Sequence, residues 1–431
     1  MRHVWLITFC LIVLSILSLF NVLSLSIQPD GSVEISDLFI KHLMFVVLGW
    51  VVYISLSRVN YSVLKFKQFN VLIYILTIGL LLATILWGPV INNTQRWLIF
   101  GEFQFQPSEM AKVTIILFTG CIFSLRNRVS EHILFLITFL LLLPIIAIVY
   151  VQPHGSMSFI LFLLWGLLVF SIMKNQLRNS LFLLTLFFSG STILAIFLGS
   201  YIYAFISFAA LITITVFIYY AREHWRKMLF VCLAVGLLIG FFSSITWNSI
   251  LLDYQKERIN AFFNPVETSQ DLGFNVDQSR VAIGSGQIFG KGWGFGTQSK
   301  LQFLPEYQTD FIFAAFSEEF GLVGSFSLII LYSILIFTIL FYALKSLSMD
   351  FEFIILTGIA IKIFLEVFIN VGTNTGIVPA TGIPLPLMSI GGTSIFFFFF
   401  SLGLVQSIIS NNVDKYRDVQ YSHIDNDEAL I

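Results

Sequence analysis

The chain has 431 residues, of which 57% are hydrophobic and only 11% are charged, and its formal net charge is −1 at pH 7. So apolar a composition excludes a soluble globular protein, and the near-zero charge creates no field that would attract nucleic acid. The three cysteines, Cys10, Cys121 and Cys232, lie in apolar runs, where buried hydrophobic roles are expected rather than disulfides or metal ligands. The sequence therefore predicts an all-α polytopic membrane protein with a single membrane domain over residues 1–410.

Apolar runs of about twenty residues, the length that an α-helix needs to cross a bilayer, recur along the whole chain. The first run is too long for the hydrophobic part of a signal peptide, and we expect it to be retained. The stretch 311–344 exceeds one crossing, and it is predicted to be one helix that starts inside a cavity or projects from the membrane. About twelve spans are predicted, at 4–27, 38–57, 69–88, 107–125, 132–151, 156–173, 180–199, 202–220, 227–246, 311–344, 353–372 and 389–410.

The distribution of basic residues predicts the orientation, because cytoplasmic loops of membrane proteins are enriched in Lys and Arg. With the N-terminus inside, segments on the inner side hold fourteen of the 23 basic residues, and the outer loop 89–106 holds only Arg96. Both termini are then cytoplasmic. The long polar segment 247–310 is an extracytoplasmic loop, and the tail 411–431 is a disordered cytoplasmic segment.

A first polar motif, "NNTQRWLIFGEFQFQPSEMAK", spans residues 92–112. Pro107 suits the first turn of a helix, where its missing N–H costs nothing, and Glu109 then lies near the positive end of the helix dipole. Lys112 follows three residues later on the same face. A lysine one turn into a membrane helix should face protein or water, so we expect this pair to line a polar cavity, although a simple capped helix start is the alternative.

Six glycines fall within residues 284–296, around Lys291. The segment matches neither a Walker loop, which needs Ser or Thr after the Gly-Lys pair, nor a dinucleotide-binding fingerprint. Two interpretations remain open. The segment is either a flexible outer loop, or a backbone that approaches a ligand closely, with Lys291 or Lys300 near an anion.

The segment 370–394, "NVGTNTGIVPATGIPLPLMSIGGTS", is too rich in Pro and Gly to form a continuous helix. Irregular backbone at membrane depth is tolerated only where protein or a cavity surrounds it, so this segment is predicted to form one wall of a site. Lys362 and Glu366 lie one turn apart before it and are expected to neutralise each other. The six histidines share no helix face at ligand spacing, and no metal site is predicted from them.

The stretch "LPEYQTDFIFAAFSEEFGLVG" at 304–324 holds four acids, and three of them, Asp310, Glu318 and Glu319, occur where an apolar helix begins. Thr309 is a good N-cap, which would place Asp310 in the first helical turn. Glu318 would then lie about 12 Å farther along the helix, with Glu319 on the opposite side, so the three cannot form a tight carboxylate pair. We expect Asp310 to face a cavity alone and the two glutamates to pair with polar groups of neighbouring helices.

Together these motifs resemble the shape, elongation, division and sporulation family, which comprises RodA, FtsW and SpoVE. The segments that carry the resemblance are "RWL", "QPSEMAK", "QSRVAIGSGQIFGKG", "GTQSKLQFLPEYQTDFIFAAFSEEFGLVG" and the 370–394 stretch, in the family's order. The wording "GTQSKLQFLPE" looks more like the RodA (elongation) branch than the FtsW (division) branch. Two departures stand out. The family has ten spans, so 180–220 looks like an additional helical hairpin, and its Gln-Pro-Asp pattern is Gln152-Pro153-His154 here.

The resemblance implies a peptidoglycan glycosyltransferase that extends glycan strands from lipid II at the outer face of the bacterial cytoplasmic membrane. Its implied partners are lipid II, undecaprenyl-diphosphate-linked glycan, a class B penicillin-binding transpeptidase and membrane proteins of the elongation machinery. It also implies that Asp310 is the essential acid and that Glu109 and Lys112 interact in the cavity.

The implied reaction fits one carboxylate together with basic residues. A sugar hydroxyl is a weak nucleophile that needs a base, whereas a diphosphate leaving group needs cations. A divalent cation, Mg²⁺ or Mn²⁺, could share the diphosphate, although the sequence shows no site for one. Candidate substrate-binding residues are Arg96, Lys112, Arg258, Lys291 and Lys300, with Gln298 and Ser389 from the matching motifs.

Three alternatives remain. A lipid II flippase or another carrier would also place polar groups inside a helix bundle, but it should show charges at the midplane and internal repeats, and no convincing repeat is found. A division-branch polymerase would share every motif above. An inactive scaffold for the transpeptidase is disfavoured by the intact Asp310 motif.

Overall fold

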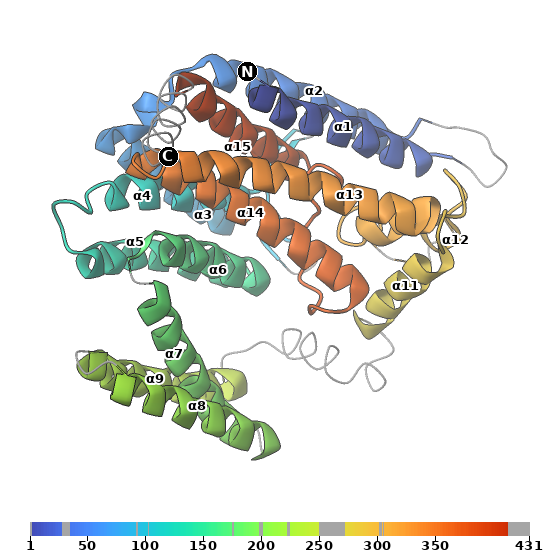
Figure 1. Cartoon of the computed structure of the whole chain (residues 1–431). Coiled ribbons are helices and arrows are strands. Elements are labelled where there is room, and N and C mark those ends of the chain that lie inside the picture. The colour runs from blue at the N-terminus through green and yellow to red at the C-terminus, as the bar shows by residue number, and fades with distance from the viewer. Residues whose placement is uncertain are drawn as a thin grey trace, which may run out of the picture. The chain divides into compact units, whose positions relative to one another are not determined.

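The structure is a computed structural model that describes residues 2–27, 35–91, 94–101, 103–174, 176–197, 201–221, 225–249, 272–300, 304 and 306–412 (Figure 1). The chain is almost entirely helical. Its helices are α1 (Arg2–Ser24), α2 (Asp37–Arg58), η1 (Tyr61–Lys65), α3 (Lys67–Trp87), α4 (Pro107–Phe123), α5 (Glu131–Val151), α6 (Gly155–Ile172), α7 (Gln176–Phe197), α8 (Tyr201–Ala221), α9 (Arg226–Ser249), α11 (Leu272–Ser285), α12 (Thr297–Lys300), α13 (Ile312–Lys345), α14 (Asp350–Thr375) and α15 (Gly392–Asn411).

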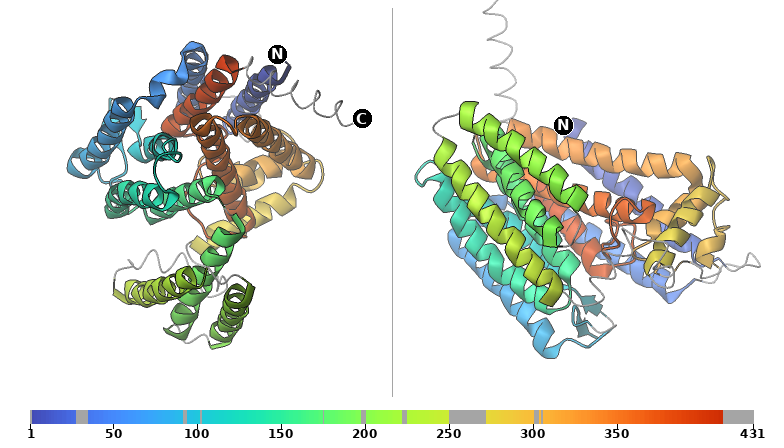
Figure 2. Two further views of the ribbon diagram at one scale, coloured as in Figure 1. Left: turned by 60° about the vertical axis from the view of Figure 1, so that its left-hand side comes forward. Right: turned by 90° about the horizontal axis from the view of Figure 1, so that it is seen from below.

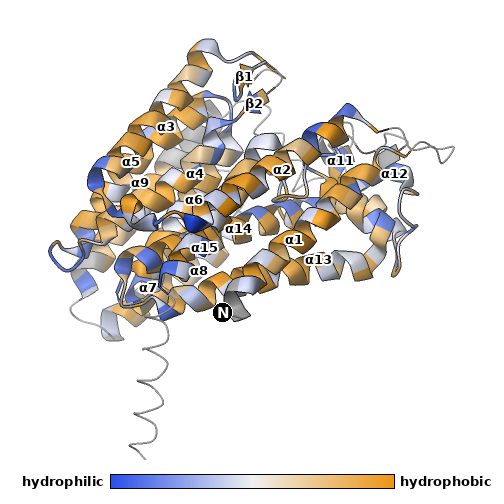
Figure 3. Cartoon of the chain, turned by 90° about the horizontal axis from the view of Figure 1, so that it is seen from above, coloured by the Kyte–Doolittle hydropathy of each residue, from blue (hydrophilic) through white to orange (hydrophobic). Residues whose placement is uncertain are grey.

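The predicted fold class is confirmed, because each of the twelve predicted spans coincides with a helix to within a few residues. Within the described residues, nine helices are long and apolar enough to cross a membrane, and α9 adds the shorter apolar stretch Leu229–Phe241. Hydrophobic residues run along these helices, while hydrophilic ones gather at loops and helix ends (Figure 3). A short antiparallel hairpin, β1 (Leu98–Phe100) and β2 (Phe103–Phe105), precedes α4.

The helices divide into two compact units. One holds the described parts of 1–169 and 261–431, and the other holds α7, α8 and α9 within 170–260. In the second unit α7 packs against α9 as well as α8, and a Cβ atom on Gly240 would lie only 2.6 Å from the carbonyl oxygen of Gly190. The hairpin predicted at 180–220 therefore corresponds to α7 and α8, but its packing includes α9.

In the larger unit, α14 lies against α13, α4, α15 and α11 (Figures 1 and 2). It is the most enclosed of the candidate spans, with 78% of its apolar window buried, compared with 22% for α2 and α3. Polar side chains on α14 are therefore forced to find partners in the protein, because lipid and water are both excluded from them.

The stretch 311–344 is one element, α13, rather than two spans, but it is interrupted at Gly321. This residue has φ 67° and ψ −165°, a conformation that is almost exclusive to glycine. The break leaves a short helix, 312–320, whose first eight residues are buried, and a long second part that ends at Lys345.

The glycine-rich segment 286–292 fills this break with its own main chain. It supplies donors to two carbonyls at the end of the short helix and acceptors to two amides that start the second part, so two free hydrogen-bonding groups at each helix end are satisfied. The bonds are Lys291 N–H to Glu318 O (3.0 Å), Gly292 N–H to Glu319 O (3.1 Å), Leu322 N–H to Gln287 O (2.8 Å) and Val323 N–H to Ile288 O (3.1 Å).

This contact explains the glycines, which neither interpretation from the sequence anticipated. A Cβ atom on Gly290 would lie 2.0 Å from the carbonyl oxygen of Glu319, and one on Gly321 would lie 2.3 Å from the amide nitrogen of Gly290. Gly290 and Gly321 therefore allow two main chains of the same protein to touch.

Of the segment 370–394, residues 376–391 between α14 and α15 are irregular, as predicted, and residues 385–389 are buried within the protein. Leu385, Leu387, Met388 and Ser389 are each at most 1% exposed. Side chains of other elements donate to its carbonyls: Ser18 to Leu387 (2.7 Å), Asn370 to Ile383 (2.8 Å), Thr373 to Pro379 (3.2 Å) and Tyr332 to Pro386.

Replacing Gly321 with alanine should destabilise the protein by more than about 1 kcal/mol, since its φ and the contact with Gly290 both exclude a side chain. Gly79 in α3 is the matched control, because a Cβ atom there would meet no atom within 4 Å. Gly79→Ala should be neutral or stabilising by up to about 1 kcal/mol. Thermal unfolding of the purified variants in detergent measures the difference, and equal melting temperatures would contradict the interpretation.

Candidate active site

Asp310 belongs to the turn 306–311 that leads into the short helix of α13. The predicted N-cap is wrong: Phe311 occupies the cap position, the helix begins at Ile312, and the Thr309 hydroxyl binds Glu306 instead. Asp310 therefore precedes the helix rather than lying in its first turn. It is partly exposed, whereas Glu318 and Glu319 are 0% and 2% exposed.

Two asparagines of α14 hold the main chain at Asp310. The side-chain amides of Asn370 and Asn374 each donate to the carbonyl oxygen of Asp310 at 3.0 Å. The carbonyl oxygen of the Asn374 side chain accepts the N–H of Ala314, also at 3.0 Å. Both asparagines are at most 1% exposed, so these bonds form away from water and define the position of the turn.

Ser389, a predicted site residue, lies at the same turn. Its hydroxyl donates to the carbonyl of Thr309 at 2.6 Å and accepts the N–H of Leu385 at 2.8 Å. On the same side, a Cβ atom on Gly382 would lie 3.4 Å from a carboxylate oxygen of Asp310. The irregular segment 376–391 therefore forms one wall around Asp310, as the sequence predicted.

Glu109 and Lys112 form the predicted ion pair, with 2.8 Å between Lys112 Nζ and Glu109 Oε1. The pair is part of a larger cluster that joins α4 to α14. Lys112 Nζ also lies 2.6 Å from Glu366 Oε1, and Lys362 Nζ lies 3.3 Å from Glu366 Oε2. All four side chains are at most 6% exposed. Two lysines and two glutamates balance in charge, which offsets part of the cost of burying them.

This cluster corrects two expectations. The predicted pairs Glu109–Lys112 and Lys362–Glu366 are one network, because Glu366 binds both lysines. The second expectation is that the polar motifs lie at the outer ends of the spans. The cluster lies deeper, since Lys362 is halfway along the 26 residues of α14.

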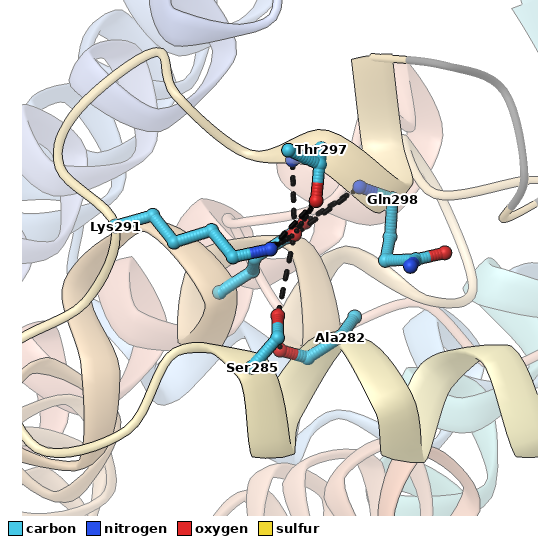
Figure 4. A network of polar contacts seen from close by, with 6 residues as sticks. Ala282, Ser285, Lys291, Thr297 and Gln298 are labelled. Carbon is cyan, nitrogen blue, oxygen red and sulfur yellow. Dashed lines mark hydrogen bonds and ion pairs between the residues drawn. The ribbon is translucent and has the colours of Figure 1, made fainter.

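Glu318 is the centre of a second polar network, shown in Figure 4. One of its carboxylate oxygens accepts hydrogen bonds from Lys291 Nζ (2.6 Å), the Thr297 hydroxyl and N–H (both 2.9 Å), the Gln298 N–H (3.1 Å) and the Ser285 hydroxyl (3.3 Å). Lys291 thus forms an ion pair with a buried carboxylate of this chain. Gln298 takes part through its main chain, so both residues hold the glycine-rich segment against the short helix.

The other predicted residues are placed differently or are not described. The Arg96 guanidinium donates to the carbonyl of Pro153, between α5 and α6. Arg258 lies outside the described residues, as does the side chain of Lys300, whose main chain ends α12. Among the residues that the structure describes, no group of three His, Cys, Asp or Glu could hold a metal ion.

Comparison with known proteins identifies the family. The model of the FtsW/RodA/SpoVE family, described as "Cell cycle protein", matches residues 4–210 and 206–414. The chain belongs to this family. It is 32% identical over 370 residues to peptidoglycan glycosyltransferase MrdB of Escherichia coli K12, covering 84% of this chain and 83% of that one. It is 29% identical over 425 residues to peptidoglycan glycosyltransferase RodA of Treponema pallidum, covering 94% and 96%.

Solved structures of the family share this fold. A chain of a peptidoglycan synthase complex, in which polymerization and crosslinking are coordinated, superposes with a TM-score of 0.63 at 23% identity, covering 96% of this chain and 97% of that one. The rod shape determining protein RodA of Thermus thermophilus gives a TM-score of 0.54 at 21% identity, with 95% and 96% covered.

One departure from the family pattern, Gln152-Pro153-His154, is accommodated by packing. The side chain of Gln152 donates to the carbonyl of Leu81 at 2.8 Å and to the hydroxyl of Thr84 at 2.7 Å, and His154 is 3% exposed. The segment therefore fixes the α5–α6 turn to α3.

Sequence reasoning missed Asn370 and Asn374 and the bond between Lys112 and Glu366. A signal was present: Lys362, Glu366, Asn370 and Asn374 recur every four residues on an otherwise apolar helix, which places them along one face. A polar face on a buried helix predicts contacts with other polar groups. What the pattern cannot provide is which groups those are.

Lys112→Met should destabilise the protein by about 3–5 kcal/mol, because it leaves Glu109 and Glu366 buried without the positive charge that pairs with both of them. Lys362→Met is the matched control and should cost clearly less, since Lys362 makes one longer contact, at 3.3 Å. Adding Glu366→Gln to Lys112→Met should restore part of the loss. Thermal unfolding in detergent tests this, and equal effects of the two lysine variants would show that the cluster is not centred on Lys112.

Proposed function

We propose that this chain polymerises lipid II into peptidoglycan glycan strands, with Asp310 as the catalytic base. The proposal rests on the observation that Asp310 is a partly exposed acid on a turn fixed by α14 and by the irregular segment 376–391. The names of the relatives, peptidoglycan glycosyltransferases MrdB and RodA, support the activity.

In the reaction, the C4 hydroxyl of an acceptor sugar attacks the anomeric carbon of a donor sugar. The new glycosidic bond forms as the bond to the undecaprenyl diphosphate breaks, and the diphosphate leaves with the bonding electrons. Asp310 takes the hydroxyl proton, a contribution of about 10²–10⁴-fold for a well-placed base. The diphosphate is already a good anion and needs positive charge rather than a proton.

The other acids of this part of the chain are committed to structure. Glu318 receives donors from four residues, and Glu109 and Glu366 are paired inside the buried cluster. Lys112, 1% exposed and bound to two glutamates, acts on the site by holding α14 rather than by touching a diphosphate. Lys291 is 28% exposed and is the better candidate for contact with a leaving group.

A divalent cation, Mg²⁺ or Mn²⁺, would supply positive charge to the leaving diphosphate. The described residues supply no cluster of three ligands for it, so no step is assigned to a metal.

The biological setting is the bacterial cytoplasmic membrane, with both termini in the cytoplasm and Asp310 toward the outer face. The expected partner is a class B penicillin-binding transpeptidase, and the structural similarity to a synthase complex that combines polymerization with crosslinking supports it. The elongation branch is favoured by the motif "GTQSKLQFLPE" and by the RodA relative. A carrier is the alternative, and the deep charges of α14 are the observation that favours it.

Asp310→Asn should abolish polymerisation of lipid II while leaving folding intact, because the amide keeps the size of the side chain and removes the base. Asp277→Asn is the matched control, since Asp277 is 50% exposed and pairs only loosely with Arg280, at 3.3 Å. Purified protein, alone and with a transpeptidase, is incubated with lipid II, and the glycan chains are separated by length. If the Asp310→Asn variant makes glycan chains of near-normal length and amount, Asp310 is not the catalytic base. If the parent protein moves lipid II but makes no polymer, the carrier function is favoured instead.

Reporter fusions test the orientation. A fusion at Lys345, the last residue of α13, should be cytoplasmic because the positive-inside rule places the short loop that follows inside. Fusions at Arg222 and Asp271, which lie outside the described residues, should be cytoplasmic and external, respectively. An external signal at Arg222 would reject the predicted hairpin topology.

A further inference from the structure

We infer that Asn370 and Asn374 are positioning residues for the Asp310 carboxylate, acting through its main chain. The inference rests on the function proposed above for Asp310. Each asparagine donates to the Asp310 carbonyl at 3.0 Å, from adjacent turns of α14. Through these two hydrogen bonds the asparagines bind the main-chain carbonyl of Asp310 and not its carboxylate.

The side chain of Asn374 replaces a helical hydrogen bond. In a continuous helix, the carbonyl of residue 310 would accept the N–H of residue 314. Here the Ala314 N–H donates to Asn374 Oδ1 at 3.0 Å, and Asn374 Nδ2 donates to the Asp310 carbonyl. The side-chain amide of Asn374 thus lies between the Asp310 carbonyl and the Ala314 N–H and is hydrogen-bonded to both. The Ala314 N–H also donates to the carbonyl of Phe311 at 3.1 Å, and α13 begins at Ile312, so Asp310 precedes the helix.

Asn370 connects the turn to the opposite wall of the site. Its amide donates both to Asp310 O and, at 2.8 Å, to the carbonyl of Ile383 in the irregular segment. Asn374 Nδ2 also donates to Asn370 O at 2.8 Å, so the two side chains support each other. Asn370 therefore joins the turn to this wall together with the Ser389–Thr309 hydrogen bond.

The buried ion cluster fixes the same face of α14. Glu366 precedes Asn370 by one turn, and Lys112 of α4 binds it at 2.6 Å. A rotation or translation of α14 that moved the asparagines would also separate this charge pair. The position of Asp310 is therefore coupled through α14 to α4, and a shift of about 1 Å in a reacting group costs up to about 100-fold in rate.

Asn370→Leu tests the inference, because leucine is of similar size and removes both donors without adding charge. Two controls are matched to it. Thr373→Val removes a bond to the same irregular segment, the one to Pro379, but touches no group of the Asp310 turn. Asn412→Leu removes a buried asparagine amide that binds Ile408 and Tyr61 at the end of α15.

Two readouts are measured on each purified, folded variant. The turnover number of Asn370→Leu for lipid II should fall about tenfold or more with KM within about twofold, since the base is displaced while substrate contacts remain. Hydrogen exchange of the amides at 310, 311 and 314 should become faster, because the turn loses its anchor. Both controls should match the parent protein in both readouts. Asn374→Leu should have the larger effect, and Asn370→Leu keeps the test valid if that variant fails to fold.

Unchanged exchange at the Asp310 turn, turnover equal to that of Thr373→Val, or a rise in KM alone would each overturn the positioning role. Absence of polymer from the parent protein would instead reject the proposed function. In that case the exchange measurement still decides whether the asparagines hold the turn.

Discussion

Main-chain polar groups that leave regular helices inside a membrane protein must find partners within the protein, and this constraint governs the site. The chain breaks helical geometry at Gly321 and over 376–391, where lipid could offer no hydrogen bond. At the first break the partners are main-chain groups of residues 287–292. At the second they are side chains of helices, among them Ser18 of α1 and Asn370 of α14. The irregular backbone that forms the site exists because these partners are present.

The polar face of α14 links stability to function. The first two residues of this face, Lys362 and Glu366, belong to the charge cluster with α4. The next two, Asn370 and Asn374, hold the turn of Asp310. Buried ion pairs contribute little net stability compared with apolar packing, but breaking one is costly. The cluster therefore fixes the position of α14 relative to α4 more than it adds stability. The two asparagines in turn fix the position of Asp310 relative to α14.

Glycine-rich motifs near a charged residue invite interpretation as ligand-binding loops. In this chain the glycines around Lys291 allow one main chain to pass within hydrogen-bond distance of another, and Lys291 neutralises Glu318. The physical requirement, close approach without a side chain, is the same in both cases. A glycine-rich motif can thus indicate that the main chain makes a close contact without indicating which group it contacts.

The sequence by itself determined the helices and their membrane character, because length and hydropathy are local properties that a bilayer imposes directly. It also determined that Lys112 needs a partner and that 376–391 must be buried, since an isolated charge or an unsatisfied backbone is costly in lipid. Only the tertiary structure decided that the partner includes Glu366, 254 residues away, that α13 breaks at Gly321, and that Asn374 replaces a helical bond at Asp310. These features depend on contacts between segments far apart in the chain, whose energies no local pattern encodes.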